Sequence, residues 1–164
     1  MTAIVSRSAE LSPCAQYRYQ LTRTLATGHG VCVFVMLNPS TADGLQDDPT
    51  IRRCLGFVQD WGFQRLVVVN LFAWRATYPK DMLKQVDPVG PDGDGWILRA
   101  CEDADRIVCA WGAQTARKVV ERADQVRRML IEAGFGIEHL GLANAGQPRH
   151  PLFLPRDARP QVWA

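Results

Sequence analysis

The chain has 164 residues, a length that suits one domain with a buried core and excludes two domains of ordinary size. Its 47% hydrophobic and 22% charged residues are typical of a globular protein. A net charge of +2 is too small to indicate a nucleic-acid partner by itself. We therefore expect a single domain over residues 1–164.

Five cysteines, an odd number, occur without a CxxC pair, and three of them lie in apolar or helical runs. This pattern favours buried free thiols in a reducing compartment over a zinc or iron–sulfur site. The sequence has neither the apolar core of a signal peptide nor an apolar run long enough to span a membrane. We expect a cytoplasmic protein with no membrane association, no metal and no cofactor.

The N-terminal third of the chain is expected to form a sheet edge. Residues 1–15 are mixed in character and predict a loose lead-in. Residues 17–21 alternate apolar and polar side chains, as in a strand with one solvated face. The turn at Gly28-His29-Gly30 predicts a hairpin between this strand and the apolar run 31–37, which is typical of a strand buried on both faces.

The apolar run 31–37 ends in LNPSTAD, where Pro39 interrupts strand pairing and turn-forming polar residues follow. Asn38, Ser40 and Thr41 therefore lie just beyond the carboxyl end of a central strand. In open α/β sheets, ligands bind at that edge. An ordinary strand-to-loop connection is the alternative interpretation.

A helix is predicted from Pro49 to about residue 61, with Asp48 as its N-cap, Pro49 at its first position and Gly62 after its end. Three acids near its start, Asp43, Asp47 and Asp48, also allow a magnesium site. Capping explains Asp48 fully, whereas the roles of Asp43 and Asp47 stay open.

The next predicted strand, 66–71, contains one polar residue, Asn70, near its end. Its amide offers donors and an acceptor, which suits either the edge of a base or the anchoring of a neighbouring loop. In the loop from Phe72 to Pro79, Phe72, Trp74 and Arg75 provide stacking and phosphate-binding groups if they are exposed, and packing groups if they are not.

The remaining chain alternates helices and strands. After an irregular stretch over 80–95, we expect a helix capped by Asp92 or Asp94, a strand over 106–111 ending at Gly112, a helix over about 114–133 and a strand near 136–142. Apolar strands separated by helices predict an α/β fold, specifically a three-layer α/β/α sandwich with a mainly parallel central sheet. Asn38, Asn70, Gly112 and the loop holding His150 then share one edge.

These residues resemble a known superfamily. LNPS after one strand, Asn70 at the end of another, AWG closing a third and HPL in the last loop are similar to motifs of the uracil-DNA glycosylase superfamily. The segments LNPSTAD, DDPTIRRC, NLFAWRATYP, AWG and RHPLFL together resemble more closely a bacterial family of unassigned function.

The wider resemblance implies a DNA glycosylase that acts on a damaged or modified base in nucleic acid, most simply DNA. Asn38 would position water, Asn70 would recognise the base with Phe72 and Trp74 beside it, and His150 would stabilise the departing base. Contacts to the nucleic-acid backbone, or a wedge into the duplex, would come from Ser40, Thr41, Arg75, Gly112, Arg149, Leu152 and Phe153.

The sequence departs from the superfamily in three places. Asn38 replaces the aspartate of its most active members, Leu37 replaces a usual glycine, and Leu152 replaces a usual serine. An asparagine accepts no proton, so a module that binds a modified base or a single strand without chemistry is one alternative. A metal-dependent phosphohydrolase using Asp43, Asp47 and Asp48 is another. For His150, the alternative to a catalytic role is a loop-stabilising histidine bonded to the backbone.

Overall fold

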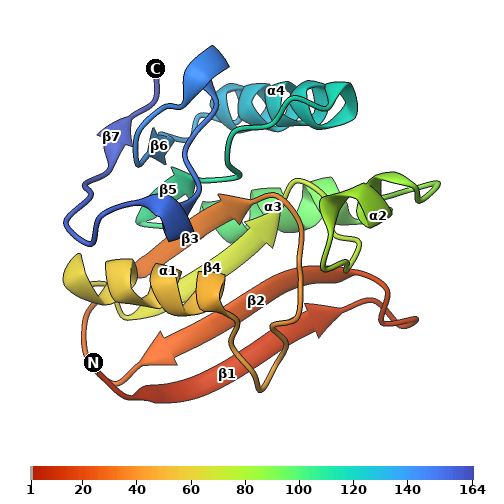
Figure 1. Cartoon of the computed structure of the whole chain (residues 1–164). Coiled ribbons are helices and arrows are strands. Elements are labelled where there is room, and N and C mark those ends of the chain that lie inside the picture. The colour runs from red at the N-terminus through yellow and green to blue at the C-terminus, as the bar shows by residue number, and fades with distance from the viewer. Residues whose placement is uncertain (1) are drawn as a thin grey trace.

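The computed structural model describes residues 2–164, and within them the chain builds one mixed seven-stranded sheet (Figure 1). The strand order across the sheet is β1 (Ile4–Leu11), β2 (Arg18–Leu25), β4 (Arg65–Asn70), β3 (Val31–Met36), β5 (Arg106–Cys109), β6 (Glu138–His139) and β7 (Gln161–Val162). The α/β class is therefore confirmed. The sheet is mixed, however: β4, β3, β5 and β6 run parallel, whereas β1, β2 and β7 pair antiparallel.

The edge formed by β1 and β2 differs from the sequence prediction. Residues 4–11, expected as part of a loose lead-in, form β1, which pairs along its length with β2. The expected hairpin between β2 and β3 is absent from the described sheet, because β4 lies between these two strands. Most side chains of β1 are exposed, so backbone pairing rather than an apolar pattern defines this strand, and the sequence carries little sign of it.

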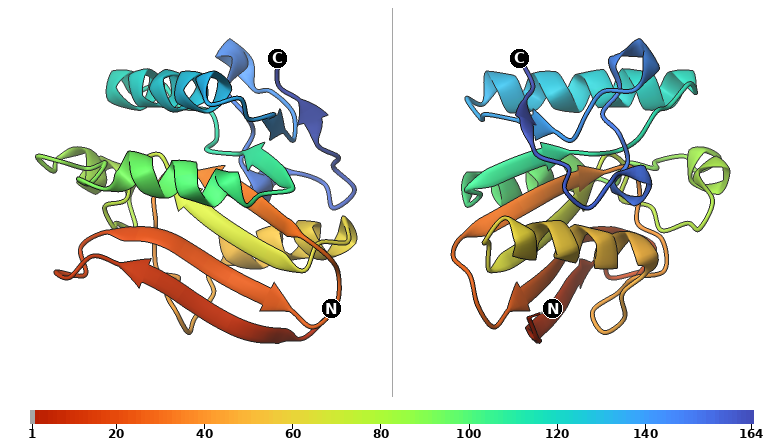
Figure 2. Two further views of the ribbon diagram at one scale, coloured as in Figure 1. Left: turned by 180° about the vertical axis from the view of Figure 1, so that it is seen from behind. Right: turned by 60° about the vertical axis from the view of Figure 1, so that its left-hand side comes forward.

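Helices pack on both faces of the sheet, as the two views of Figure 2 show. Helix α1 (Pro49–Asp60) covers one face, where it meets Cys32, Phe34 and Met36 of β3. Helices α2 (Pro79–Leu83), α3 (Gly93–Glu102) and α4 (Arg117–Glu132) cover the other face, where Val33 and Val35 point. This alternation along β3 explains its uninterrupted apolar sequence.

The C-terminal part of the chain returns to the carboxyl ends of the parallel strands. Two short 3₁₀ helices, Asn144–Gly146 and Pro151–Phe153, lie in the segment between β6 and β7, and the second packs against α1. Over residues 2–164, none of the helices combines the length and apolar character that a membrane span requires.

Candidate functional site

A pocket of about 730 Å³ lies beyond the carboxyl ends of the parallel strands. The four strand exits expected to share an edge all contribute to its lining, through Asn38 after β3, Asn70 at the end of β4, Gly112 after β5 and His150 after β6. The first turn of α1 closes the pocket from one side with Asp48, Thr50 and Ile51. This is the position at which open α/β sheets bind ligands.

Asn70 presents an unpaired amide to the pocket. Its side chain is 5% exposed, and neither Oδ1 nor Nδ2 has a hydrogen-bond partner anywhere in residues 2–164. Both the donor and the acceptor of a buried amide are normally paired, because each unpaired group costs about 1–3 kcal/mol. The second interpretation of Asn70, as a loop anchor, therefore finds no hydrogen bond to support it among the described residues.

Asn38 is held in a fixed orientation at the wall of the pocket. Its Nδ2 donates to the carbonyl of Ala76 over 2.9 Å and to the carbonyl of Pro39 over 3.1 Å. The amide nitrogen is thus occupied, and Oδ1 is the end left to accept a hydrogen bond from water or a ligand. Ser40, two residues further on, also lines the pocket.

His150 combines a structural contact with a free donor. Its Nδ1 accepts a hydrogen bond from the backbone N–H of Leu152 over 3.2 Å and so caps the 3₁₀ helix that begins at Pro151. Burial lowers the pKa of His150, and the charge of Asp48 partly opposes this effect. The imidazole is consequently neutral at pH 7, and with Nδ1 accepting, the proton lies on Nε2 as a donor.

Gly112 joins the exit of β5 to the loop that carries His150. Its backbone N–H donates to the carbonyl of Pro148 over 2.9 Å, its φ is +87°, and a Cβ there would lie 3.4 Å from Cβ of His150. Trp111 beside it donates from Nε1 to Oε1 of Gln147 over 2.7 Å, and both side chains are buried. Gly112 therefore packs the loop closely against the strand exit.

The mouth of the pocket carries exposed apolar side chains beside an arginine. Leu152 is 40% exposed and Phe153 is 85% exposed. Phe153 lies against the His150 ring, with 5.8 Å between ring centroids. Arg149 is exposed at the same rim, and its Nε donates to the carbonyl of Leu142 over 3.4 Å.

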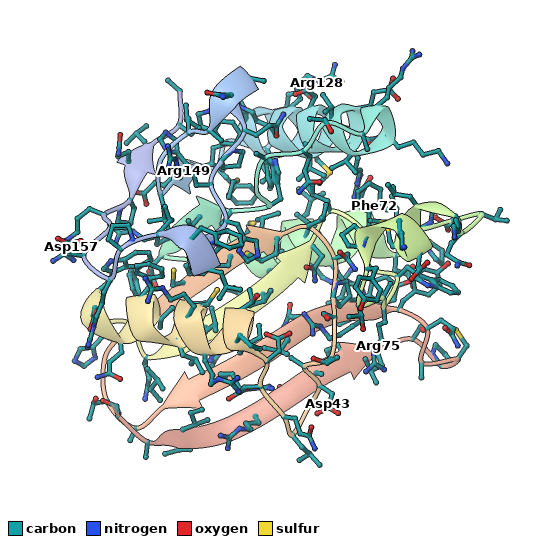
Figure 3. The ribbon with its side chains drawn as sticks, in the orientation of Figure 1. Asp43, Phe72, Arg75, Arg128, Arg149 and Asp157 are labelled. Atoms are coloured by element: carbon teal, nitrogen blue, oxygen red, sulfur yellow. The ribbon has the colours of Figure 1, made fainter. Side chains whose placement is uncertain are left out.

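Four residues predicted for the site do not line the pocket. Phe72 is buried in the core beneath α3 and α4, and Trp74 packs edge-on against Tyr17, with centroids 5.4 Å apart. Arg75 donates to the carbonyl of Ala15, and Thr41 is exposed outside the pocket. Figure 3 shows Phe72 and Arg75 on the α2 side of the view, and Arg149 on the opposite side. The chain turns after Asn70 and buries its apolar residues on the other face of the sheet.

The three acids do not converge. Asp48 Oδ1 accepts from the N–H of Ile51 over 2.9 Å, which confirms its capping role, and Asp48 is the one carboxylate among the described residues that line the pocket. Asp43 accepts the N–H groups of Leu45 and Gln46, and these bonds lower its pKa. No group of three or more histidine, cysteine or acidic residues suited to a metal occurs in the part of the chain that the structure describes.

The third acid, Asp47, holds the loop between β3 and α1 against the sheet. Its Oδ1 accepts from Nε of Arg23, which is fully buried in β2, over 2.7 Å. The guanidinium of Arg23 also donates to the carbonyls of Asp43 and Gln46. This ion pair therefore fixes the loop that follows Asn38 and leads to Asp48.

Sequence reasoning missed Arg18 as a pocket residue. Arg18 is 2% exposed and lines the pocket from β2. Strict alternation from Tyr17 predicts that Arg18 faces solvent. The register between β1 and β2 shifts from the pair Glu10–Gln20 to the pair Leu11–Arg18. Tyr19 is therefore an extra residue in β2, and this bulge turns the side chain of Arg18 inward.

Comparisons with known proteins give one assignment. No curated protein and no solved structure matches the chain. The family match covers residues 18–152, which include every residue that lines the pocket except Phe153 and Leu154. The chain thus belongs to the family described as "Protein of unknown function (DUF1643)".

Proposed function

We propose that the protein binds a nucleobase of nucleic acid in this pocket and hydrolyses its N-glycosidic bond. The observation that carries the proposal is the unpaired amide of Asn70, buried at the end of a central strand and lining the pocket. A base edge with a neighbouring acceptor and donor, such as the carbonyl and imide N–H of uracil, complements both ends of that amide. Binding such an edge removes the free-energy cost of the two unpaired groups.

The residues around Asn70 supply the groups that the reaction needs. The C–N bond breaks with its electron pair moving to the base, while the sugar takes up positive charge and then bonds to the oxygen of water. The Nε2–H of His150 donates to the base oxygen where negative charge develops. Asn38 Oδ1 orients the water, and the carboxylate of Asp48 accepts its proton and opposes the charge on the sugar.

The rim suits a base that leaves its stack. Leu152 and Phe153 expose apolar surface beside the pocket, and Arg149 adds a positive charge there. An apolar side chain inserted into a duplex fills the space that an extruded base leaves, and arginine binds the neighbouring phosphate. These features agree with the resemblance of LNPS, AWG and HPL to the uracil-DNA glycosylase superfamily, and DNA is the partner we propose.

Base excision measured under single-turnover conditions tests the proposal. The substrates are oligonucleotides carrying uracil, mismatched, deaminated or hypermodified bases, with and without EDTA. Two variants separate the roles of His150: His150→Asn keeps an acceptor for the N–H of Leu152 and removes the Nε2 donor, whereas His150→Gln keeps a distal donor and removes the cap. We expect abasic sites that resist EDTA, and excision slowed about 100- to 1,000-fold by His150→Asn.

A base-binding module without chemistry is the second candidate. Asn38 favours it, since its amide nitrogen is tied to Ala76 and its side chain takes no proton. Binding that depends on Asn70, with no abasic sites on any substrate, would establish the binding module instead of the glycosylase. Phosphate release that requires magnesium would contradict both candidates and indicate a phosphohydrolase.

A further inference from the structure

Arg18 is a buried cation whose donors the protein leaves largely unused. Its Nη1 donates to the carbonyl of Ala42 over 2.8 Å, and its Nε has no hydrogen-bond partner within residues 2–164. Arg18 is only 2% exposed, yet it lines the pocket. A guanidinium carries five N–H donors, so most of the donors of Arg18 meet no acceptor among the described residues.

The other two buried arginines, Arg23 and Arg122, each lie beside a carboxylate partner. Arg23 pairs with Asp47 over 2.7 Å, and Arg122 lies 2.7 Å from Oδ1 of Asp94 and donates to the carbonyl of Leu71. Neither of them lines the pocket. Within the described chain, Arg18 forms no ion pair at 4.0 Å or less, unlike these two. Burial of a cation without a carboxylate partner is costly, so its persistence in a pocket indicates an external anion.

The charge of the pocket supports an anionic ligand. Burial lowers the pKa of Arg18 to about 10, and the charge of Asp48 counteracts part of that effect, so Arg18 stays protonated at pH 7. Arg149 adds a second positive charge, Asp48 is the single carboxylate in the described lining, and His150 is neutral. The pocket therefore has a net positive charge.

Arg18 and Asn70 face the same pocket from neighbouring strands. Strand β2 pairs with β4, with Leu21 opposite Val68, and the extra residue at Tyr19 places Arg18 on the face that Asn70 occupies. We propose that Arg18 binds an anionic oxygen group carried by the same ligand whose base edge pairs with Asn70. The substrate class narrows to a base or nucleotide with a phosphate or a carboxylate beside the base, and this inference rests on the base recognition proposed above.

Calorimetric titration with paired probes tests the inference. The probes are deoxyuridine and the four DNA nucleosides, their 5′-monophosphates, uracil beside 5-carboxyuracil, and inorganic phosphate alone. In the wild type, the anionic member of one pair should bind about 10- to 100-fold more tightly than its neutral counterpart. A preference for a monophosphate identifies a nucleotide phosphate as the anion, and a preference for 5-carboxyuracil identifies a carboxylated base.

Arg18→Met should abolish that preference and leave the affinity for the neutral probe unchanged. Arg18→Lys keeps the charge without the planar fork and should retain part of the preference, which provides a second variant if Arg18→Met does not fold. Arg128→Met is the matched control, since it removes an exposed arginine that lies outside the pocket lining and should preserve the preference. Melting curves of all variants verify that each one is folded.

The outcomes separate this inference from the proposed function. Neutral nucleosides that bind through Asn70 with no anionic preference would overturn the role of Arg18 and keep base recognition. Phosphate binding that depends on Arg18 without any dependence on the base would support Arg18 and overturn base recognition. An anionic preference that survives Arg18→Met would also overturn the role of Arg18. Absence of binding by every probe would overturn both the role of Arg18 and base recognition.

Discussion

Asn70 ends strand β4 with an amide at a position that follows three buried valines, Val67 to Val69. An unpaired amide in such a place lowers the free energy of unfolding, and an apolar side chain of similar volume would not. Proteins keep destabilising groups of this kind where a ligand uses them. The environment of this single residue therefore links the stability of the free protein to the function of the pocket.

Asn70→Leu should stabilise the free protein and abolish ligand binding. Leucine has the same number and branching of side-chain heavy atoms and removes two unpaired polar groups, so we expect the free energy of unfolding to rise by about 1 kcal/mol. Urea unfolding measures the change in stability, and oligonucleotide binding measures the loss of function. Asn70→Asp is the control, because it keeps the shape and adds a buried charge that should destabilise the fold. A loss of stability in Asn70→Leu would show that the amide is paired in solution.

Helix α1 brings its N-terminus to the pocket, and the side chain of Asp48 both caps the helix and lines the pocket. Asp48 caps the helix by accepting the N–H of Ile51, Pro49 occupies the first position, and the second carboxylate oxygen of Asp48 is left for the pocket. Asparagine caps helices about as well as aspartate does, but it carries no charge. The two roles of Asp48 are therefore separable by substitution.

Asp48→Asn should preserve stability and slow base excision by about 100-fold, because it keeps the cap and removes the proton acceptor. Asp48→Ala should slow excision similarly and also lower the free energy of unfolding by about 1 kcal/mol. Thermal melts and single-turnover rates measure the two effects. Excision by Asp48→Asn at the wild-type rate would exclude Asp48 as the proton acceptor and restrict it to capping.

At the scale of the whole molecule, two histidines couple stability to pH. His139 in β6 accepts the N–H of Gly141 at Nδ1 over 2.9 Å, as His150 accepts that of Leu152. Burial lowers the pKa of both imidazoles, and the charge of Arg127 lowers that of His139 further. Protonation at Nδ1 would break each of these bonds.

The free energy of unfolding should therefore fall as the pH drops. Because the native pKa values lie below the unfolded value of about 6.5, the unfolded chain takes up protons first. The stabilisation is complete above pH 6.5 and decreases as the pH falls from there through the lowered native pKa values. Urea unfolding at intervals from pH 8 to pH 5 measures it. The double variant His139→Asn, His150→Asn keeps both acceptors and should flatten the profile, and a wild-type profile already flat over this range would contradict the prediction.

The elements that could be predicted are those with a strong local signal. The apolar runs of β3 and β4, the cap at Asp48 and the glycine that follows α1 all act within a few residues, so the sequence suffices to place them. β1 and β7 could not be predicted, because exposed edge strands depend on pairing with a distant partner. The position of β4 between β2 and β3 likewise depends on pairing between segments that are distant in the sequence.

The sequence alone determined that polar groups follow apolar strands at Asn38, Asn70, Gly112 and His150, since strand ends and turns are local features. Only the tertiary structure decided which groups reach the pocket. The bulge at Tyr19 turned Arg18 inward, and the burial of Phe72 on the far face removed it from the site. Side-chain direction in a strand reverses with a single extra residue, so the membership of a site built from several strands depends on register, which long-range pairing sets.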